Sequence, residues 1–227
     1  NNAFSKGKAF IPFITCGQIS LDITEKTIYE MEKNGANLIE LGIPFSDPVA
    51  EGYIIQSANN RALKNGTTTD KIFSMLESVR KNTDIPMVFM TYANIVFSYG
   101  IDRFAEKSKK LKIDGIILPD VPYEEKKEFD SIFKKHNIDF ISLIAPTSEE
   151  RISAIAKDSN GFIYCVSSLG VTGIRENINT NIEKMVNLVK SVNDIPVAVG
   201  FGISTPEQAK EMSEYADGVI VGSAIVK

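Results

Sequence analysis

The sequence predicts an α/β protein folded as a (β/α)8 barrel, also called a TIM barrel. Short apolar runs alternate along the chain with segments whose apolar residues recur at helical spacing, which is typical of parallel strands joined by helices. Eight strands in series, with no linker or low-complexity tract, favour a closed barrel over a doubly wound sheet. The runs lie at 9–15, 38–43, 87–92, 115–119, 138–145, 161–167, 196–201 and 217–222.

Each run has the composition of a strand buried on both faces. The runs are mostly continuous in apolar residues instead of alternating with polar ones, as parallel strands covered by helices require. Between them, apolar stripes at 72–79, 129–133 and 182–189 predict amphipathic helices. Thr205-Pro206-Glu207 predicts the start of another helix, because proline and an acidic residue both suit the first turn.

We expect residues 1–227 to form a single barrel domain. At 227 residues the chain is shorter than the about 250 typical of this fold, and it stops just after the eighth strand, where the last helix should follow. It begins with Asn1 instead of methionine. We therefore expect N-terminal and C-terminal segments, the final helix among them, to lie outside the given sequence.

The composition argues against several classes of function. A net charge of −4 provides no basic surface for nucleic acid or an anionic membrane, and no apolar run approaches the about 18 residues of a membrane span. Two cysteines, Cys16 and Cys165, cannot build a disulfide framework, so a reducing cytoplasmic location is expected. One histidine and no clustered ligands give no support for a metal site.

The second strand carries the first candidate catalytic group. Glu40 lies inside the apolar run 38–43, where a charged side chain is costly unless it is paired or changes its protonation state. The loop-forming stretch that follows brings a second carboxylate, Glu51. The two could work as an acid/base pair. Alternatively, Glu40 could form an ion pair with a neighbouring strand, and Glu51 could be solvated.

Glycine-rich turns follow the last two predicted strands, at Gly200-Phe201-Gly202 and Gly222-Ser223. Glycine lets backbone N–H groups approach an anion closely, and the turns after strands seven and eight are the usual phosphate site of this fold. The sequence therefore favours a phosphate site here, although the glycines could also serve only to make tight turns.

Further polar residues stand at the carboxyl ends of other predicted strands, where barrel active sites lie. Tyr92 and Asn94 follow the third strand, Asp120 follows the fourth, and Tyr164 belongs to the sixth. The two tyrosines could equally be core aromatics with a hydrogen-bonded hydroxyl.

Long motifs in this chain resemble the signature of the tryptophan synthase α-subunit family. The resemblance runs the whole length, through the segments 11–15 (IPFIT), 39–48 (IELGIPFSDP), 90–94 (MTYAN), 119–122 (PDVP), 170–173 (GVTG), 200–204 (GFGIS) and 222–227 (GSAIVK), with Gln56 and 61–63 (RAL) behind the second. Stretches of this length and specificity do not arise by chance.

The resemblance implies retro-aldol cleavage of indole-3-glycerol phosphate to indole and glyceraldehyde 3-phosphate, without a cofactor in this subunit. It assigns the proton transfers to Glu40, and it assigns to Glu51 the carboxylate that accepts a hydrogen bond from the indole N–H. It places Phe13, Tyr92 and Tyr164 around the substrate and Thr172 in a loop that closes over it. It also implies a phosphate cradle formed by Gly173, Gly202, Gly222 and Ser223. It further ties Asp47 to communication with a β subunit.

The resemblance further implies assembly with a β subunit as an α2β2 heterotetramer. Three positions depart from the family pattern: Glu51 where many members have aspartate, Tyr53 where proline is usual, and Gln18 where an acidic residue is common. Three alternatives stay open. The chain could be a stand-alone lyase that releases indole, a weakly active subunit that mainly activates a β subunit, or another phosphate-binding barrel enzyme such as a sugar-phosphate isomerase or epimerase.

Overall fold

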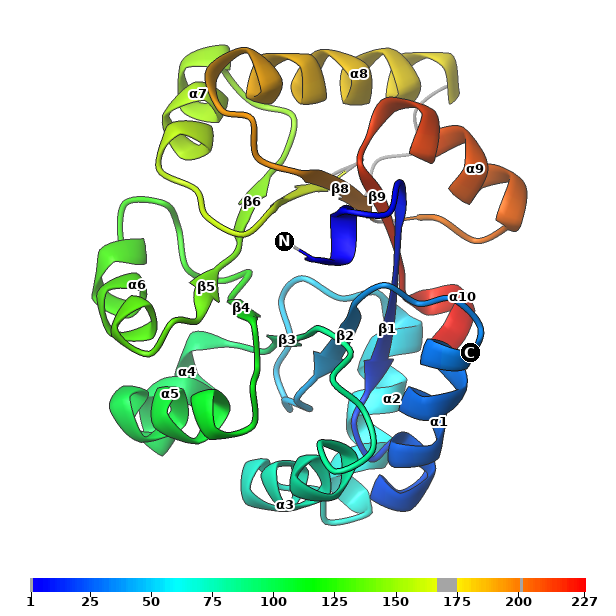
Figure 1. Ribbon diagram of the computed structural model, residues 1–227, viewed down its shortest axis with the longest axis vertical. Helices are drawn as coiled ribbons and strands as arrows, with labels where there is room; N and C mark the ends of the chain where they lie inside the picture. The colour runs from blue at the N-terminus through cyan, green and yellow to red at the C-terminus, as the bar shows by residue number, and fades with distance from the viewer. Residues whose placement is uncertain (1, 167–174, 201) are drawn as a thin grey trace.

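The computed structural model describes residues 2–166, 175–200 and 202–227, and it confirms the predicted barrel of parallel strands surrounded by helices (Figure 1). Every strand pairing is parallel, in the order β5-β4-β3-β2-β1-β9-β8-β7-β6. The strands are β1 (Ala9–Thr15), β2 (Ile39–Gly42), β3 (Met87–Met90), β4 (Gly115–Ile117), β5 (Asp139–Phe140), β6 (Ser142–Ile144), β7 (Ile163–Val166), β8 (Val197–Gly200) and β9 (Gly218–Val221).

The expected fifth strand, 138–145, is divided into β5 and β6 at Ile141. β5 pairs with β4, and the Ile141 N–H donates to the Ile116 carbonyl at 2.9 Å. From Ser142 onward the chain pairs with β7 instead. The segment thus closes the barrel, because its first half (β5) pairs with β4 and its second half (β6) pairs with β7. Between β4 and β6 no strand pairing is present among the described residues, so the wall has a seam there.

The helices lie outside the strands, as Figure 1 shows. The predicted stripes become α3, α6 and α8, and Thr205 caps α9 by accepting the Gln208 N–H. The 3-10 helix η1 (Asn2–Phe4) precedes β1. The α-helices are α1 (Leu21–Lys33), α2 (Tyr53–Lys64), α3 (Thr69–Val79), α4 (Ala93–Tyr99), α5 (Ile101–Lys110), α6 (Lys126–Lys135), α7 (Glu149–Lys157), α8 (Arg175–Val192), α9 (Pro206–Tyr215) and α10 (Ser223–Val226).

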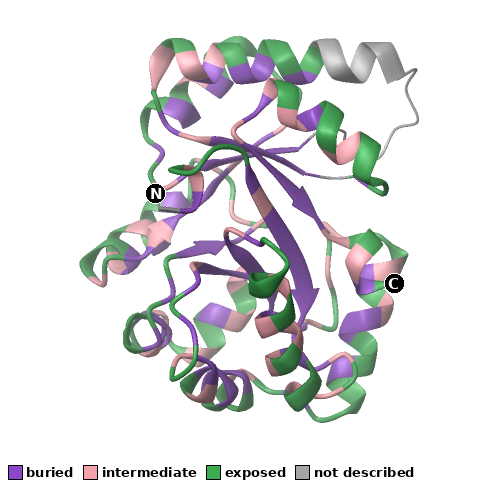
Figure 2. Cartoon of the chain, turned by 45° about the vertical axis from the view of Figure 1, so that its right-hand side comes forward, coloured by how far each residue is buried: buried purple, intermediate pink, exposed green. Residues whose placement is uncertain are grey.

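Apolar side chains fill both sides of the strand wall. One cluster lies inside the barrel and includes Ile11 and Phe13 of β1, Val88 of β3 and Ile220 of β9. Two others lie between the strands and the helices. Figure 2 shows the result: the strands are buried, and the helices turn exposed faces outward. In the described ranges no helix is long and apolar enough to cross a membrane.

Glycines make room for large aromatic side chains inside the barrel. A Cβ at Gly42 would lie 2.6 Å from the Phe13 ring, and a Cβ at Gly200 would lie 2.7 Å from ring carbons of Tyr164. Real Cβ atoms essentially never make contacts this short. The two glycines are therefore needed to seat Phe13 and Tyr164 at the carboxyl end of the barrel.

At the opposite end of the strands, one arginine joins two loops. The Arg80 guanidinium donates to the carbonyls of Leu111 at 2.8 Å, Ile85 at 2.6 Å and Lys112 at 2.8 Å. The planar fork of five N–H donors suits several carbonyls at once, which a lysine ammonium does not. Arg80 thus fixes the connections that lead into β3 and β4.

We predict that Arg80→Met lowers the free energy of unfolding by about 2–4 kcal/mol, because buried carbonyls lose their donor. Arg80→Lys should recover only part of this loss. Lys81→Met, at the exposed neighbouring position, is the control and should change stability by less than about 0.5 kcal/mol. Urea unfolding measures all three. An Arg80→Met variant as stable as the control would show that water replaces the guanidinium.

Candidate active site

A cavity of about 150 Å³ opens at the carboxyl end of the barrel. It brings together residues from β1, β2, β3, β7 and β9 with the turns that follow β2, β8 and β9. Its lining comprises Phe13, Glu40, Ala50, Glu51, Gly52, Ile55, Met90, Tyr164, Gly202, Ile203, Ser204, Ile220, Gly222 and Ser223.

Glu40 lies at the floor of this cavity, only 1% exposed. It stands beside Phe13 of β1 and Val88 of β3 in the strand register. Neither carboxyl oxygen has a hydrogen-bond partner among the described residues. Burial, with a smaller contribution from the negative charge of Glu51, raises the pKa of Glu40 from 4.5 to about 8. A group with a pKa near neutrality can both donate and accept a proton.

Glu51 reaches the same cavity from the loop between β2 and α2, and a tyrosine holds it there. The Tyr92 hydroxyl donates to Glu51 Oε2 at 2.5 Å and accepts the Ala50 N–H at 3.1 Å. Tyr92 is 2% exposed, and its ring packs on Phe45 at 5.0 Å between centroids. It therefore contacts both ends of the loop segment that carries Glu51. Burial raises the pKa of Glu51, and the Tyr92 hydrogen bond partly opposes this.

Asp120, which follows β4, contacts the residue after Tyr92 and affects the pKa of Glu51. Both of its carboxylate oxygens accept the Ala93 N–H, each at 3.1 Å, at the start of α4. Its negative charge contributes to the raised pKa of Glu51. Asp120 thus anchors the helix that begins directly after Tyr92.

Apolar walls complete the cavity above Glu40. Phe13 and Tyr164 face it from the strands, with Ile55, Met90 and Ile220 around them. Burial, and then the charge of Glu40, raise the pKa of Tyr164 well above its ordinary value, so its hydroxyl stays protonated. Apolar walls of this kind fit a flat aromatic ring. The two carboxyl groups could exchange protons with such a ring or accept a hydrogen bond from its N–H group.

Two turns beside these walls offer backbone donors. Gly202 has a φ of +75°, which side-chain-bearing residues rarely adopt. Gly222 precedes α10, and the N–H groups of Ser223 and its successor lie in the first turn, where they have no intrahelical partner. The Ser204 N–H is different, because it donates to the Gln208 side chain at 2.8 Å. Gly202, Gly222 and Ser223 all belong to the cavity lining.

The structure gathers most of the predicted site residues at one place. The cavity lining includes Phe13, Glu40, Glu51, Tyr164, Gly202, Gly222 and Ser223, and Tyr92 contacts the site through Glu51. Asp47 is exposed, outside the lining, and hydrogen-bonded to Ser46. Thr172 and Gly173 lie outside the described residues.

Sequence reasoning missed the apolar lining residues Ile55, Met90 and Ile220. Met90 and Ile220 lie in apolar runs that look like ordinary core. Their alternation could have identified them, since residues two apart share a face of a strand. Ile55 had no signal, because only the fold brings α2 to the cavity. No group of three or more His, Cys, Asp or Glu among the described residues could hold a metal ion.

Fold and cavity together define a (β/α)8 barrel that carries ionisable groups at the carboxyl ends of its strands. The chain belongs to the family described as tryptophan synthase alpha chain, which it matches over residues 1–227. A tryptophan synthase alpha chain from Lacticaseibacillus casei is 47% identical over 225 residues, covering 99% of this chain and 85% of that relative.

Solved structures agree with this family. Tryptophan synthase subunit alpha from Campylobacter jejuni is 34% identical, with a TM-score of 0.91 over 98% of this chain and 89% of that one. A tryptophan synthase α2β2 complex from Pyrococcus furiosus contains a chain that is 37% identical, with a TM-score of 0.88 over 97% of this chain and 89% of that one. The family places this chain among lyases of tryptophan synthesis.

The raised pKa of Glu40 predicts a specific dependence of stability on pH. With a pKa of about 8 in the folded chain and 4.5 as its ordinary value, the folded state holds a proton that the unfolded state has lost. Stability should therefore fall as pH rises from about 4.5 to about 8. Glu40→Gln removes this titration, so the variant should exceed the parent by about 2–5 kcal/mol at pH 8.

At about pH 3 the two proteins should differ by less than about 1 kcal/mol, because the carboxyl is then protonated in both the folded and the unfolded state. Urea unfolding at the two pH values gives the comparison. Glu77→Gln, on the exposed face of α3, serves as the control. An equal difference at both pH values would mean that Glu40 keeps an ordinary pKa.

Proposed function

We propose that this chain cleaves indole-3-glycerol phosphate into indole and glyceraldehyde 3-phosphate, as the α subunit of a tryptophan synthase. This makes it a carbon–carbon lyase that acts on an aldol-type bond. The observation that carries the proposal is Glu40, a buried carboxyl with no hydrogen-bond partner among the described residues, at the floor of a cavity that a second carboxyl enters. Family membership supplies the substrate class.

Glu40 performs both proton transfers of the reaction. Its raised pKa keeps it protonated at neutral pH, so it first gives its proton to C3 of the indole ring. The resulting carboxylate takes the proton of the side-chain hydroxyl next to the breaking bond. That oxygen becomes the aldehyde of glyceraldehyde 3-phosphate, and the bonding electrons return to the ring as indole leaves. Glu40 ends protonated, so no external acid or base is consumed.

Glu51 stabilises the intermediate between these two transfers. Protonation at C3 leaves positive charge on the ring nitrogen, and a carboxylate that accepts the indole N–H opposes this charge. Tyr92 already orients Glu51 through its 2.5 Å hydrogen bond, which limits the rearrangement needed when substrate arrives. Phe13 and Tyr164 enclose the ring, and they help to keep water from the carboxyl groups.

The phosphate lies against the backbone N–H groups of Gly202, Gly222 and Ser223. Neither lysine nor arginine belongs to the cavity lining within the described part of the chain, so dipoles hold the anion instead of a charged clamp. Thr172 and Gly173, whose placement stays a prediction, complete the substrate loop and the cradle.

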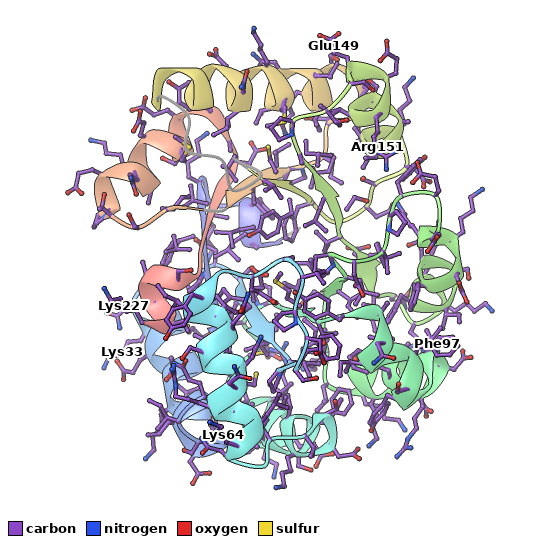
Figure 3. The ribbon with its side chains drawn as sticks, turned by 180° about the vertical axis from the view of Figure 1, so that it is seen from behind. Lys33, Lys64, Phe97, Glu149, Arg151 and Lys227 are labelled. Atoms are coloured by element: carbon purple, nitrogen blue, oxygen red, sulfur yellow. The ribbon has the colours of Figure 1, made fainter. Side chains whose placement is uncertain are left out.

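The surface around the loop between β2 and α2 is suited to binding a β subunit. Val49 is 78% exposed, Tyr53 84% and Phe97 of α4 63%, and Figure 3 shows Phe97 at the outer edge of the molecule. Contiguous exposed apolar side chains mark interaction surfaces. Val49 and Tyr53 follow Asp47 in the connection from β2 into α2, so a partner bound there would contact the loop that carries Glu51. This surface favours an α2β2 assembly over a stand-alone lyase. A cytoplasmic location fits such an assembly.

The experiment that tests the proposal is indole release from indole-3-glycerol phosphate by the isolated chain, repeated with a β subunit. Activity in both arms, with acceleration by the partner, supports an α subunit. Equal activity would favour the stand-alone lyase. Absence of indole in both arms would contradict the proposed reaction.

We predict that Glu40→Gln lowers indole release by about 10²–10⁴-fold, since an amide cannot exchange the proton. The parent rate should fall as pH rises through about 8, because deprotonated Glu40 cannot protonate C3. Steady-state rates across pH measure both effects, and unfolding curves show that the variant is folded. Glu77→Gln should keep the parent rate. A Glu40→Gln variant that releases indole at near-parent rate would remove Glu40 from the mechanism.

We predict that Tyr53→Pro raises the activity of the isolated chain. Tyr53 is the first residue of α2 after the cap Gly52, a position where proline needs no N–H partner and its fixed φ is suitable. Proline there restricts the free loop, so less ordering remains for substrate binding.

Steady-state indole release by Tyr53→Pro, Tyr53→Ala and the parent, each with and without β subunit, checks this. The alanine variant removes the ring without fixing φ, so it should not reproduce the gain. A proline variant no faster than the parent would show that Tyr53 does not limit loop ordering.

A further inference from the structure

The seam between β4 and β6 contains a second cavity, which the proposed reaction does not use. It encloses about 340 Å³. We call it the seam cavity; it is lined by Pro119, Val121, Pro122, Tyr123, Lys126, Phe140, Ser142, Leu143, Ala145, Pro146, Thr147, Arg151 and Ile155. It exists because β6 pairs with β7, so among the described residues β4 has no strand partner on its β5 side beyond Ile116. Figure 1 shows α6 and α7 outside this part of the wall.

The seam cavity has the make-up of a ligand site. Its volume falls within the about 300–1,000 Å³ of small-molecule pockets, which combine apolar walls with a few polar groups. Its floor is buried: Phe140 is 3% exposed, Ile155 5% and Ser142 5%. Its rim, which includes Thr147 and Arg151, is exposed, and Figure 3 labels Arg151 on α7.

Lys126 gives this cavity its charge. The first residue of α6, it is 2% exposed, and its Nζ donates to the Asp158 carbonyl at 2.6 Å and to Ser142 Oγ at 3.4 Å. Its counter-ion is the Asp158 carboxylate at 3.3 Å, which is 53% exposed and outside the lining.

Arg151 resembles Lys126 in this respect: it lines the cavity, whereas its ion-pair partner Glu124 does not. Both charged side chains in the lining of the seam cavity are therefore cations, and the carboxylates that pair with them are not part of the lining.

A purely structural role for Lys126 would be to join α6 to the C-terminal end of α7. That role alone does not require a charge, because a well-packed apolar side chain at a buried position is often as stable as an ion pair. Nor does it require the open space in front of the lysine. A ligand that brings one negative charge and an apolar body accounts for both features.

We propose that the seam cavity binds a small organic anion, a carboxylate or phosphate monoester on a flat apolar body. The anion contacts Lys126 and Arg151, and Ser142 and Thr147 offer hydroxyl donors. The body packs on Phe140, Leu143 and Ile155. Benzoate and phenyl phosphate serve as the two probes, and inorganic phosphate, which has no apolar body, serves as a comparison.

Ligand-observed NMR titration of the intact chain tests the proposal. We expect saturable binding of at least one organic probe and none of inorganic phosphate at the seam; the better probe identifies the anion. Lys126→Met should weaken that binding about tenfold or more, because a charged contact is lost. Lys127→Met, at the exposed next position, should leave it unchanged. Ser223→Glu, which blocks the proposed phosphate cradle, should also leave it unchanged and so excludes the catalytic cavity.

A second variant keeps the test decisive if Lys126→Met does not fold. Thr147→Trp narrows the mouth from an exposed position without touching the Lys126–Asp158 pair, and it should weaken the probe to a similar degree. The proposal is overturned if neither organic probe binds, or if binding survives Thr147→Trp and any folded Lys126→Met protein. Loss of binding in Ser223→Glu alone would assign the probes to the catalytic cavity and would equally overturn it.

Discussion

A carboxyl group that has no hydrogen-bond partner in the described part of the chain and is enclosed by a strand wall is stable mainly in its neutral form. Glu40 is in this position, because the barrel removes it from water and the charge of Glu51 opposes its ionisation. The same surroundings keep it protonated at neutral pH, which is the state that the proposed reaction requires. The packing that seats Phe13 and Tyr164 around it therefore sets its chemistry, and Gly42 and Gly200 set that packing.

The three departures from the family pattern have structural counterparts. Glu51 uses its longer arm to accept the Tyr92 hydroxyl. Tyr53 begins α2, so the proline usual there would fit the same backbone. Gln18 accepts from Arg61 at 3.2 Å and donates to the Val226 carbonyl at 3.4 Å; an acidic residue could make only the first contact. Of the three, only Glu51 acts on Glu40, through its negative charge; Tyr53 and Gln18 act on the β2–α2 loop and on α10.

The strands were predictable because burial on both faces leaves continuous apolar runs, and Glu40 was noticeable because it interrupts one. The break at Ile141 was not predictable, since no glycine or proline interrupts run 138–145 and barrel closure decides which neighbour each half joins. The Tyr92–Glu51 hydrogen bond depends on the reach of one side chain across two loops. Lys126 lies in Glu124-Glu125-Lys126-Lys127, which looks like a solvated charge run; only the position of α6 over the seam buries it.

The segment from Pro119 to Tyr123 stands between the two cavities of the barrel. On one side Asp120 anchors α4 directly after Tyr92, the residue that holds Glu51. On the other side Val121 and its neighbours line the seam cavity. A ligand in the seam would contact the segment whose carboxylate contributes to the pKa of Glu51. A seam ligand would therefore act on Glu51 through Asp120, whose carboxylate both anchors α4 and contributes to the raised pKa of Glu51.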